Sequence, residues 1–243
     1  MICMKSAILV FKREFLGYFR SPVAYVVLVG FHLLATFLTF FFSRILQGNE
    51  ASLTGFFQWM PWMFVVLVPA AAMRLWAEER RAGTIELMFT LPVTTGAAVF
   101  GKFLAAWAFI AIAILLTLPF SFTVGYLGDP DSGVIVASYF GSIIMAASYV
   151  GICSLASAFT RNQVIAFIIG LLVCLFLTSL GLSVAGDLLG SFLPYWVVDA
   201  ISNFSFYTHF ESMTRGLVDF RSVVFFASLA AITLLANVVV LEH

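Results

Sequence analysis

EERRAGTIELMFTLP, residues 78–92, begins with four consecutive charged side chains in a chain that otherwise avoids charge. The sequence of 243 residues is 63% hydrophobic and only 10% charged. A soluble domain is about 45–50% apolar and about 25% charged. The mean hydropathy of +1.09 therefore indicates an integral membrane protein of the all-α class, in which residues 78–92 connect two apolar segments outside the lipid.

Six segments are long and apolar enough to cross a membrane as helices, since a span needs about 20 mainly apolar residues. They are residues 22–43, 56–76, 99–126, 134–159, 163–185 and 222–241. We see no soluble domain between them, so residues 1–243 are predicted to form a single transmembrane domain with both termini on one side. The last three residues, Leu241-Glu242-His243, read either as native sequence or as the start of an expression tag.

Basic residues are divided unequally between the two faces of this topology. Nine lie in the N-terminal segment and around the second and fourth connections, and three lie on the opposite face. The nine are Lys5, Lys12, Arg13, Arg20, Arg74, Arg80, Arg81, Lys102 and Arg161, and the three are Arg44, Arg215 and Arg221. Because cytoplasmic segments carry the excess of Lys and Arg, both termini are predicted to be cytoplasmic.

Residues 1–21 are predicted to form an interfacial helix lying on the membrane. Its apolar residues recur at helical spacing and its cations fall mostly on the other face, an arrangement that suits anionic lipid. The apolar residues are Met4, Ile8, Phe11, Phe15 and Phe19, and the cations are Lys5, Lys12, Arg13 and Arg20. Pro22 should end this helix before the first span. The pattern suits a simple positive-inside anchor as well as a helix that also contacts a cytoplasmic partner.

Small residues spaced by four in the segment 134–159 predict close helix packing, which we expect within the subunit rather than at a subunit interface. They include Ala137, Gly141, Ala147, Gly151, Ser154 and Ala158. Residues 186–221 form an extracytoplasmic connection rich in aromatic residues, for which we expect short helices in the surface of the outer leaflet. Phe206, Phe210, Met213 and Leu217 should share one helical face there, with Glu211 paired to Arg215.

The sequence offers no pattern of residues for catalysis. Residues 96–102, GAAVFGK, satisfy G-x-x-x-x-G-K, but Phe103 stands where a P-loop needs the Ser or Thr that ligates magnesium, and no strand precedes. Leaving Tyr and Cys aside, His32 is the one titratable residue at membrane depth, and we interpret it as structural. We therefore expect no enzyme activity, no metal site and no ion-coupled transport driven by this chain alone. The net charge of zero suggests no nucleic-acid partner.

The stretch 78–92 has the local signals of a short helix between two spans. Gly83 can adopt the left-handed conformation that ends a helix, and Thr84 is a good N-cap for the next one. Glu86 would lie in the first turn of that helix, where negative charge is favoured, and Pro92 would stop it. Its apolar face would include Ile85, Met88 and Phe89. Composition alone also fits a solvated loop.

The same stretch fits the pattern E-x-x-x-G-T-x-E-L-x-x-x-L-P. The fixed positions are Glu79, Gly83, Thr84, Glu86, Leu87, Leu91 and Pro92. In that register it resembles the cytoplasmic coupling segment of ABC-2-type transporter permeases. Further blocks resemble the sub-group named after the gliding-motility permease: Arg74-Leu-Trp-Ala-Glu-Glu-Arg-Arg81, Gly101-Lys102-Phe103, Leu127-Gly-Asp-Pro130, and His209-Phe-Glu-Ser212 with Arg215-Gly216.

The resemblance implies a permease subunit that forms half of a membrane pathway for export in the bacterial cytoplasmic (inner) membrane. Two such subunits, identical or related, would pair, and each would dock on a separate cytoplasmic ATPase that carries the ATP and magnesium. The resemblance implies that polar contacts with the ATPase come from Glu78, Glu79, Arg80, Arg81 and Glu86. Gly83 and Thr84 would form the bend. The apolar docking face would consist of Ile85, Met88, Phe89 and Leu91, and the coupling segment would end at Pro92. The alternative is a non-transporting scaffold or force-transmitting subunit that recruits an ATPase.

Overall fold

The computed structural model describes residues 2–42, 52–85, 94–128, 130–182, 190 and 194–242. Within these ranges the chain is helical and contains no strand, so the all-α prediction is confirmed for them. The helices are α1 (Ile2–Arg20), α2 (Pro22–Phe42), α3 (Thr54–Gln58), α4 (Met60–Ala72), α5 (Ala77–Ala82), α7 (Thr95–Leu115), α8 (Leu118–Leu127), α9 (Ser132–Ala158), α10 (Gln163–Ser179), α12 (Tyr195–Ser202), α13 (Phe206–Thr214) and α14 (Phe220–Glu242).

Five apolar helical segments in the described ranges are long enough to cross a membrane. They are Pro22–Phe41, Met60–Ala82, Thr95–Leu127, Ser132–Ala158 and Phe220–Glu242. The fifth predicted span, residues 163–185, starts at residue 163 as expected, but α10 has only 17 residues. At 1.5 Å per residue it is about 25 Å long, which is shorter than the hydrocarbon core of about 30 Å. The structure thus supports five spans by length and one shorter apolar helix.

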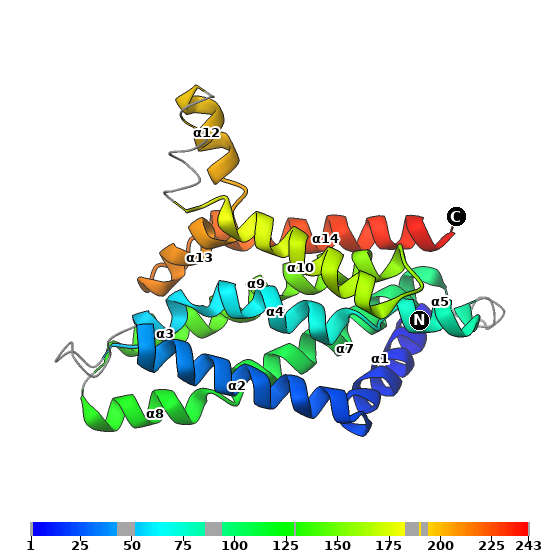
Figure 1. The fold of residues 1–243 in the computed structure, drawn as a ribbon, viewed down its shortest axis with the longest axis horizontal. Helices are drawn as coiled ribbons and strands as arrows, with labels where there is room; N and C mark the ends of the chain where they lie inside the picture. Colours follow the sequence, from blue (N-terminus) through cyan, green and yellow to red (C-terminus); the bar gives the residue numbers. More distant parts are fainter. Residues whose placement is uncertain are drawn as a thin grey trace.

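The long helices lie side by side, and the two ends of the bundle differ. Figure 1 shows α1 and α5 at the end where both chain termini lie, and α3, α8 and α13 at the opposite end. The predicted boundary at Pro22 is confirmed, because α1 ends at Arg20 and α2 begins at Pro22.

Two of the predicted spans are interrupted rather than continuous. The third span breaks between α7 and α8, where Pro119 has no N–H to offer the helix and the Thr117 hydroxyl donates to the carbonyl of Ile114 (2.6 Å). The second span, expected to continue as one helix to about Arg81, breaks into turns at residues 73–76 before α5. That second break lies at the end of the bundle that carries α1.

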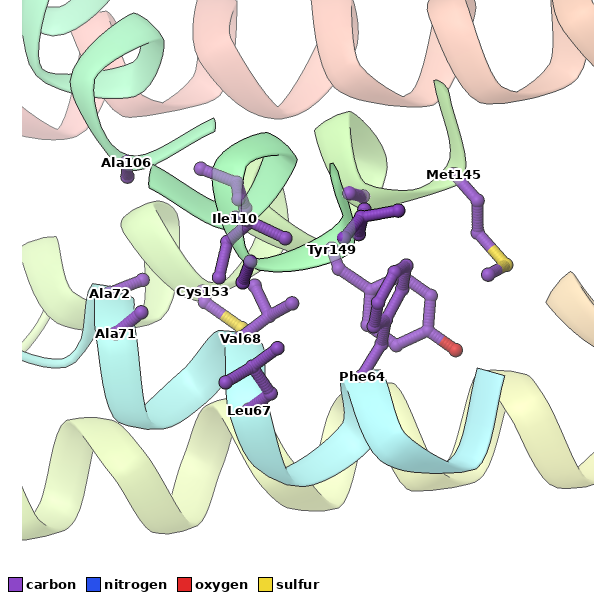
Figure 2. Packing of buried hydrophobic residues seen from close by; sticks show 14 of the residues in the cluster. Phe64, Leu67, Val68, Ala71, Ala72, Ala106, Ile110, Met145, Tyr149 and Cys153 are labelled. Atoms are coloured by element: carbon purple, nitrogen blue, oxygen red, sulfur yellow. The ribbon is translucent and has the colours of Figure 1, made fainter. Parts of the chain in front are cut away.

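Helix α9 lies at the centre of the core. Figure 2 shows Phe64 and Val68 of α4 and Ile110 of α7 packed beside Tyr149 and Cys153 of α9. The rings of Phe64 and Tyr149 meet edge to face, with centroids 5.8 Å apart. This core is formed by side chains from separate spans, so it fixes the bundle without any soluble domain.

The small residues of α9 allow other helices to approach closely. A Cβ placed on Gly141 would lie 2.5 Å from Sδ of Met213 in α13, and one on Gly151 would overlap Thr233 of α14. The expected packing within the subunit is therefore confirmed at these two glycines.

Helix α13 differs from the expected helix at the outer membrane surface. Its apolar face, formed by Phe206, Phe210 and Met213, is buried against the bundle instead of facing lipid. The expectation for Leu217 is wrong, because α13 ends at Thr214 and the Leu217 side chain is 67% exposed. The pairing of Glu211 with Arg215 is confirmed at 2.5 Å. Aromatic periodicity identified the apolar face, but it could not distinguish protein from lipid as the covering surface.

Helix α1 packs along α7, and Gly101 is the residue that permits the close approach. A Cβ on Gly101 would lie 2.7 Å from the carbonyl oxygen of Ala7 and 2.9 Å from Cβ of Val10. On α1, Phe11 and Phe15 are half-buried and their rings stack, with centroids 5.5 Å apart. The apolar face predicted to meet the headgroups thus packs partly on protein.

Gly101→Ala is expected to push α1 away from α7, because the new methyl group meets a backbone oxygen that no rotamer change can move. Overpacking of this kind costs about 1–3 kcal/mol. The measurement is thermal unfolding of the purified protein in detergent. Gly96→Ala on the same helix is the matched control, since a Cβ there meets nothing within 4 Å. Equal melting temperatures for the two variants would contradict the close approach.

Candidate functional site

The break between α4 and α5 is held by one serine of α9. The Ser157 hydroxyl donates to the carbonyl of Met73 (2.9 Å) and accepts the backbone N–H groups of Trp76 and Ala77 (both 3.1 Å). These are backbone groups that an uninterrupted helix would satisfy internally. A single buried hydroxyl therefore replaces the missing helical bonds and ties α5 to α9.

Lys102 of α7 supplies a hydrogen-bond donor to the same break from the side opposite Ser157. Its ammonium donates to the carbonyl of Leu75 (2.7 Å) and lies 4.9 Å from the ring centroid of Trp76. The Lys102 side chain is only 2% exposed. A buried ammonium needs compensation by opposite charge, because removal from water is costly.

Two glutamates supply that compensation. Nζ of Lys102 lies 2.9 Å from Oε1 of Glu79 in α5 and 3.5 Å from Oε1 of Glu14 in α1. Arg13 completes the cluster, with Nη2 2.6 Å from Oε1 of Glu14 and 3.4 Å from Oε1 of Glu79. We call these four residues the charged cluster. It joins α1, α5 and α7 at one point.

Glu14 and Arg13 of the charged cluster are ionised at neutral pH. Burial opposes ionisation of Glu14, but the nearby charges of Lys102 and Arg13 outweigh it and hold the pKa of Glu14 below its ordinary value. Because this pKa is lowered in the folded state, the stabilisation from Glu14 is complete at neutral pH and is lost as the pH falls through the lowered pKa. The hydrogen bond to Glu14 also raises the pKa of Arg13.

Tyr18 anchors α1 beside the charged cluster. Its hydroxyl donates to the carbonyl of Ala71 in α4 (3.0 Å), and its ring stacks on Phe109 of α7 with centroids 4.7 Å apart. The guanidinium of Arg74 lies over the same ring, 4.7 Å from the centroid. Burial raises the pKa of Tyr18, so the phenol remains neutral and keeps its donor.

A second polar chain links the break to the C-terminal helix. The Trp76 indole N–H donates to Oγ of Ser154 (3.1 Å), which also accepts from the Asn237 side chain of α14 (2.7 Å). The start of α5 is therefore bonded to α7 and α9 directly and to α14 through Ser154, while the charged cluster adds α1.

The far end of α5 has the predicted turn. Gly83 has φ of 68°, and the N–H of Thr84 donates to the carbonyl of Glu79 (3.1 Å), which closes the helix as a Schellman-type end. Glu78, Arg81, Gly83 and Thr84 are exposed. The prediction for Gly83 is thus confirmed.

The predicted coupling residues fall into four groups. Glu78, Arg81, Gly83 and Thr84 are exposed, whereas Arg80 and Ile85 are half-buried, with Arg80 Nη2 lying 3.5 Å from the carbonyl of Val240 and Ile85 packed on the core. Glu79 points one oxygen into the charged cluster instead of outward. Glu86, Met88, Phe89, Leu91 and Pro92 lie outside the described residues, as does any helix after Thr84.

Sequence reasoning missed the partners of Glu79. Lys102 was interpreted as a marker of topology and as part of the family resemblance, although one ammonium in a run of apolar helix should have signalled a buried partner. Glu14 could not be paired with it from sequence, because 88 residues separate the two positions. Ser157 carried no signal, since serines are common in helices that pack closely.

A pocket of about 400 Å³ opens beside the charged cluster. Its charged lining is balanced, with three cations (Arg13, Arg74, Lys102) and three carboxylates (Glu14, Glu78, Glu79). Among the described residues no group of three or more His, Cys, Asp or Glu side chains could hold a metal ion. The arrangement is suited to transmitting displacement between helices, because it fixes their relative positions with buried polar bonds.

A bundle of long apolar helices, with the charged cluster at the end that carries α1 and α5, defines the class as a multi-pass membrane protein. The sequence matches the family model described as ABC-2 family transporter protein over residues 10–240. Since this match covers nearly the whole chain, the protein belongs to the ABC-2 transporter family, as the resemblance of residues 78–92 implied. A search of curated proteins finds no match to the sequence. The family makes the chain the membrane component of an ABC transporter, associated with an ABC ATPase.

Proposed function

We propose that this chain is a permease subunit in which α5 and the residues that follow it receive movement from a cytoplasmic ATPase. The observation that carries the proposal is the asymmetry of α5. Glu78 and Arg81 are exposed on it, whereas Glu79 is bound into the charged cluster. One side of the helix is thus available to a partner while the other side is held by the bundle.

Movement of α5 would be transmitted through identified bonds. The salt bridge between Glu79 and Lys102 connects α5 to α7, and the Ser157 hydroxyl connects the start of α5 to α9. Arg13 contacts both glutamates, so α1 would move with α5. Because the bonds of Lys102 and Ser157 are buried, α5 cannot shift without breaking them or carrying α7 and α9 along.

The assembly that we propose contains two permease subunits and separate ATPase subunits with their ATP and magnesium. In this assembly α10 also crosses the membrane, which brings the number of membrane helices to six. The end of the bundle with α1 and α5 faces the cytoplasm. The membrane is the bacterial inner membrane, and the direction of transport is export. The position of both chain termini at the α5 end supports an even number of crossings. We also propose that the chain belongs to the sub-group of gliding-motility permeases.

The rival function is transmission of force without transport, with the same charged cluster serving an ATPase-driven mechanical signal. The polar bonds around α5 suit both functions. Transport by vesicles that contain the purified complex distinguishes them, because only a permease moves a solute across the sealed membrane.

The test uses the complex purified from native membranes through a tag on this chain. Arg81→Glu is expected to reduce ATPase recovery at least tenfold, because charge reversal at a docked surface places like charges together. Arg215→Glu, exposed at the opposite end, is the matched control and should retain the ATPase. The isolated chain should hydrolyse no ATP. Full ATPase recovery with Arg81→Glu, or hydrolysis by the pure chain, would overturn the proposal.

A further inference from the structure

His32 has a buried hydrogen-bond acceptor without a partner. Its Nδ1 lies 2.8 Å from the carbonyl oxygen of Leu28, and because a carbonyl only accepts, Nδ1 must carry the proton. In the neutral ring Nε2 is then an acceptor. This Nε2 is buried and has no hydrogen-bond partner among the described residues. Leaving a buried polar atom unsatisfied is costly, so a partner is expected from outside the described residues.

A pocket of about 100 Å³ adjoins His32 between α2, α3 and the junction of α7 with α8. Its threonine hydroxyls give their protons to helix carbonyls: Thr36 to His32 (2.7 Å), Thr39 to Ala35 (2.6 Å) and Thr117 to Ile114 (2.6 Å). The Thr36 oxygen, like Nε2, therefore presents an acceptor to the pocket. A complementary ligand must bring a hydrogen-bond donor.

The rest of the lining limits the ligand further. Among the described residues, no Asp, Glu, Lys or Arg lines this pocket, and Phe56 and Phe120 form an apolar wall with ring centroids 5.4 Å apart. An ammonium group would be poorly compensated here, because a buried charge needs a partner of opposite charge. A neutral donor such as a hydroxyl group carries no such penalty.

The depth of the pocket favours a lipid-soluble ligand. His32 is the eleventh of the 21 residues of α2, so it lies about 15 Å along the helix from either end. In a membrane-spanning α2 this is the middle of the hydrocarbon layer, where water is scarce. The pocket also borders exposed side chains, since Thr36 and Leu116 face outward from the bundle.

We propose that this pocket binds the hydroxyl group of a neutral, mainly apolar molecule, with the O–H donating to Nε2 of His32. The pocket volume suits only the hydroxyl-bearing end, and the apolar remainder lies outside it along α2 and α8. Such a molecule is either a membrane lipid with a free hydroxyl or a transported amphiphile. The inference needs α2 to span the membrane, but it does not depend on which ATPase drives the protein.

The experiment uses the full-length protein in nanodiscs and a long-chain alcohol that carries a photoreactive diazirine and an alkyne tag. Its methyl ether is the matched probe, since it keeps the oxygen and the apolar chain but has no O–H donor. We expect saturable labelling of α2 or α8 by the alcohol and about tenfold weaker labelling by the ether, equivalent to about 1.4 kcal/mol. His32→Phe, which keeps an aromatic ring but removes the acceptor, should reduce labelling by the alcohol to the level of the ether.

Equal labelling by the two probes, or no saturable labelling of these helices, would overturn the proposal and leave water as the occupant. The comparison of probes uses the unaltered protein, so it remains decisive even if His32→Phe fails to fold. Competition by unlabelled diacylglycerol in the nanodisc distinguishes a lipid ligand from a transported one: displacement identifies a lipid, and labelling that changes with ATP in the complete complex identifies a transported amphiphile. Both results support the hydroxyl site.

Discussion

Lys102→Met is expected to destabilise the protein and to uncouple ATP hydrolysis by the ATPase from movement of the membrane helices. The substitution keeps an unbranched side chain but removes the ammonium from between Glu14 and Glu79, and it leaves the carbonyl of Leu75 without its donor. Removing one partner of a buried ion pair costs about 3–5 kcal/mol. Because the glutamates are 22% and 19% exposed, we expect the lower end of that range. Thermal unfolding in detergent measures the stability, and ATPase stimulation of the reconstituted complex measures the coupling.

The double variant Lys102→Met with Glu79→Gln is the matched control for this experiment. It removes one carboxylate together with the ammonium, so most of the charge left uncompensated by Lys102→Met disappears and the melting temperature should recover in part. The link from α5 to α7 stays broken, so coupling should remain low. If Lys102→Met retains wild-type coupling, the charged cluster only stabilises the fold and does not transmit movement.

Gly83→Val is expected to abolish docking of the ATPase while changing the fold little. Gly83 has φ of 68°, and a left-handed conformation costs an ordinary residue about 1–2 kcal/mol, more for a β-branched one. A Cβ at Gly83 meets nothing within 4 Å, so the effect comes from the backbone alone. The valine would redirect the chain after α5 and thereby displace the segment through Pro92. Co-purification of the ATPase is the measurement.

Gly83→Asn is the control for the valine variant, because asparagine tolerates the left-handed region far better than a β-branched residue. It should keep most of the ATPase. If the valine variant also assembles and functions normally, the direction of the chain after α5 does not matter and residues 84–92 act as a solvated loop.

Helix identity and most helix boundaries could be predicted from the sequence, because they depend on local properties. Apolar runs identified the long helices, the fixed φ of Pro22 marked the start of α2, and the conformational freedom of Gly83 marked the end of α5. The pattern of residues 78–92 also identified the family, since the match over residues 10–240 agrees with it. These signals require no knowledge of which helices touch.

The sequence by itself determined an all-helical membrane protein of the ABC-2 family with an exposed turn at Gly83. Only the tertiary structure decided what holds that turn in place. Lys102, Glu14 and Ser157 are far from Glu79 in sequence, and they meet it or the adjacent break only because α1, α7 and α9 pack at one end of the bundle. Likewise, only packing decided that α13 buries its apolar face in protein. The physical reason is that an apolar face or a buried charge requires some partner, but local sequence does not specify which one.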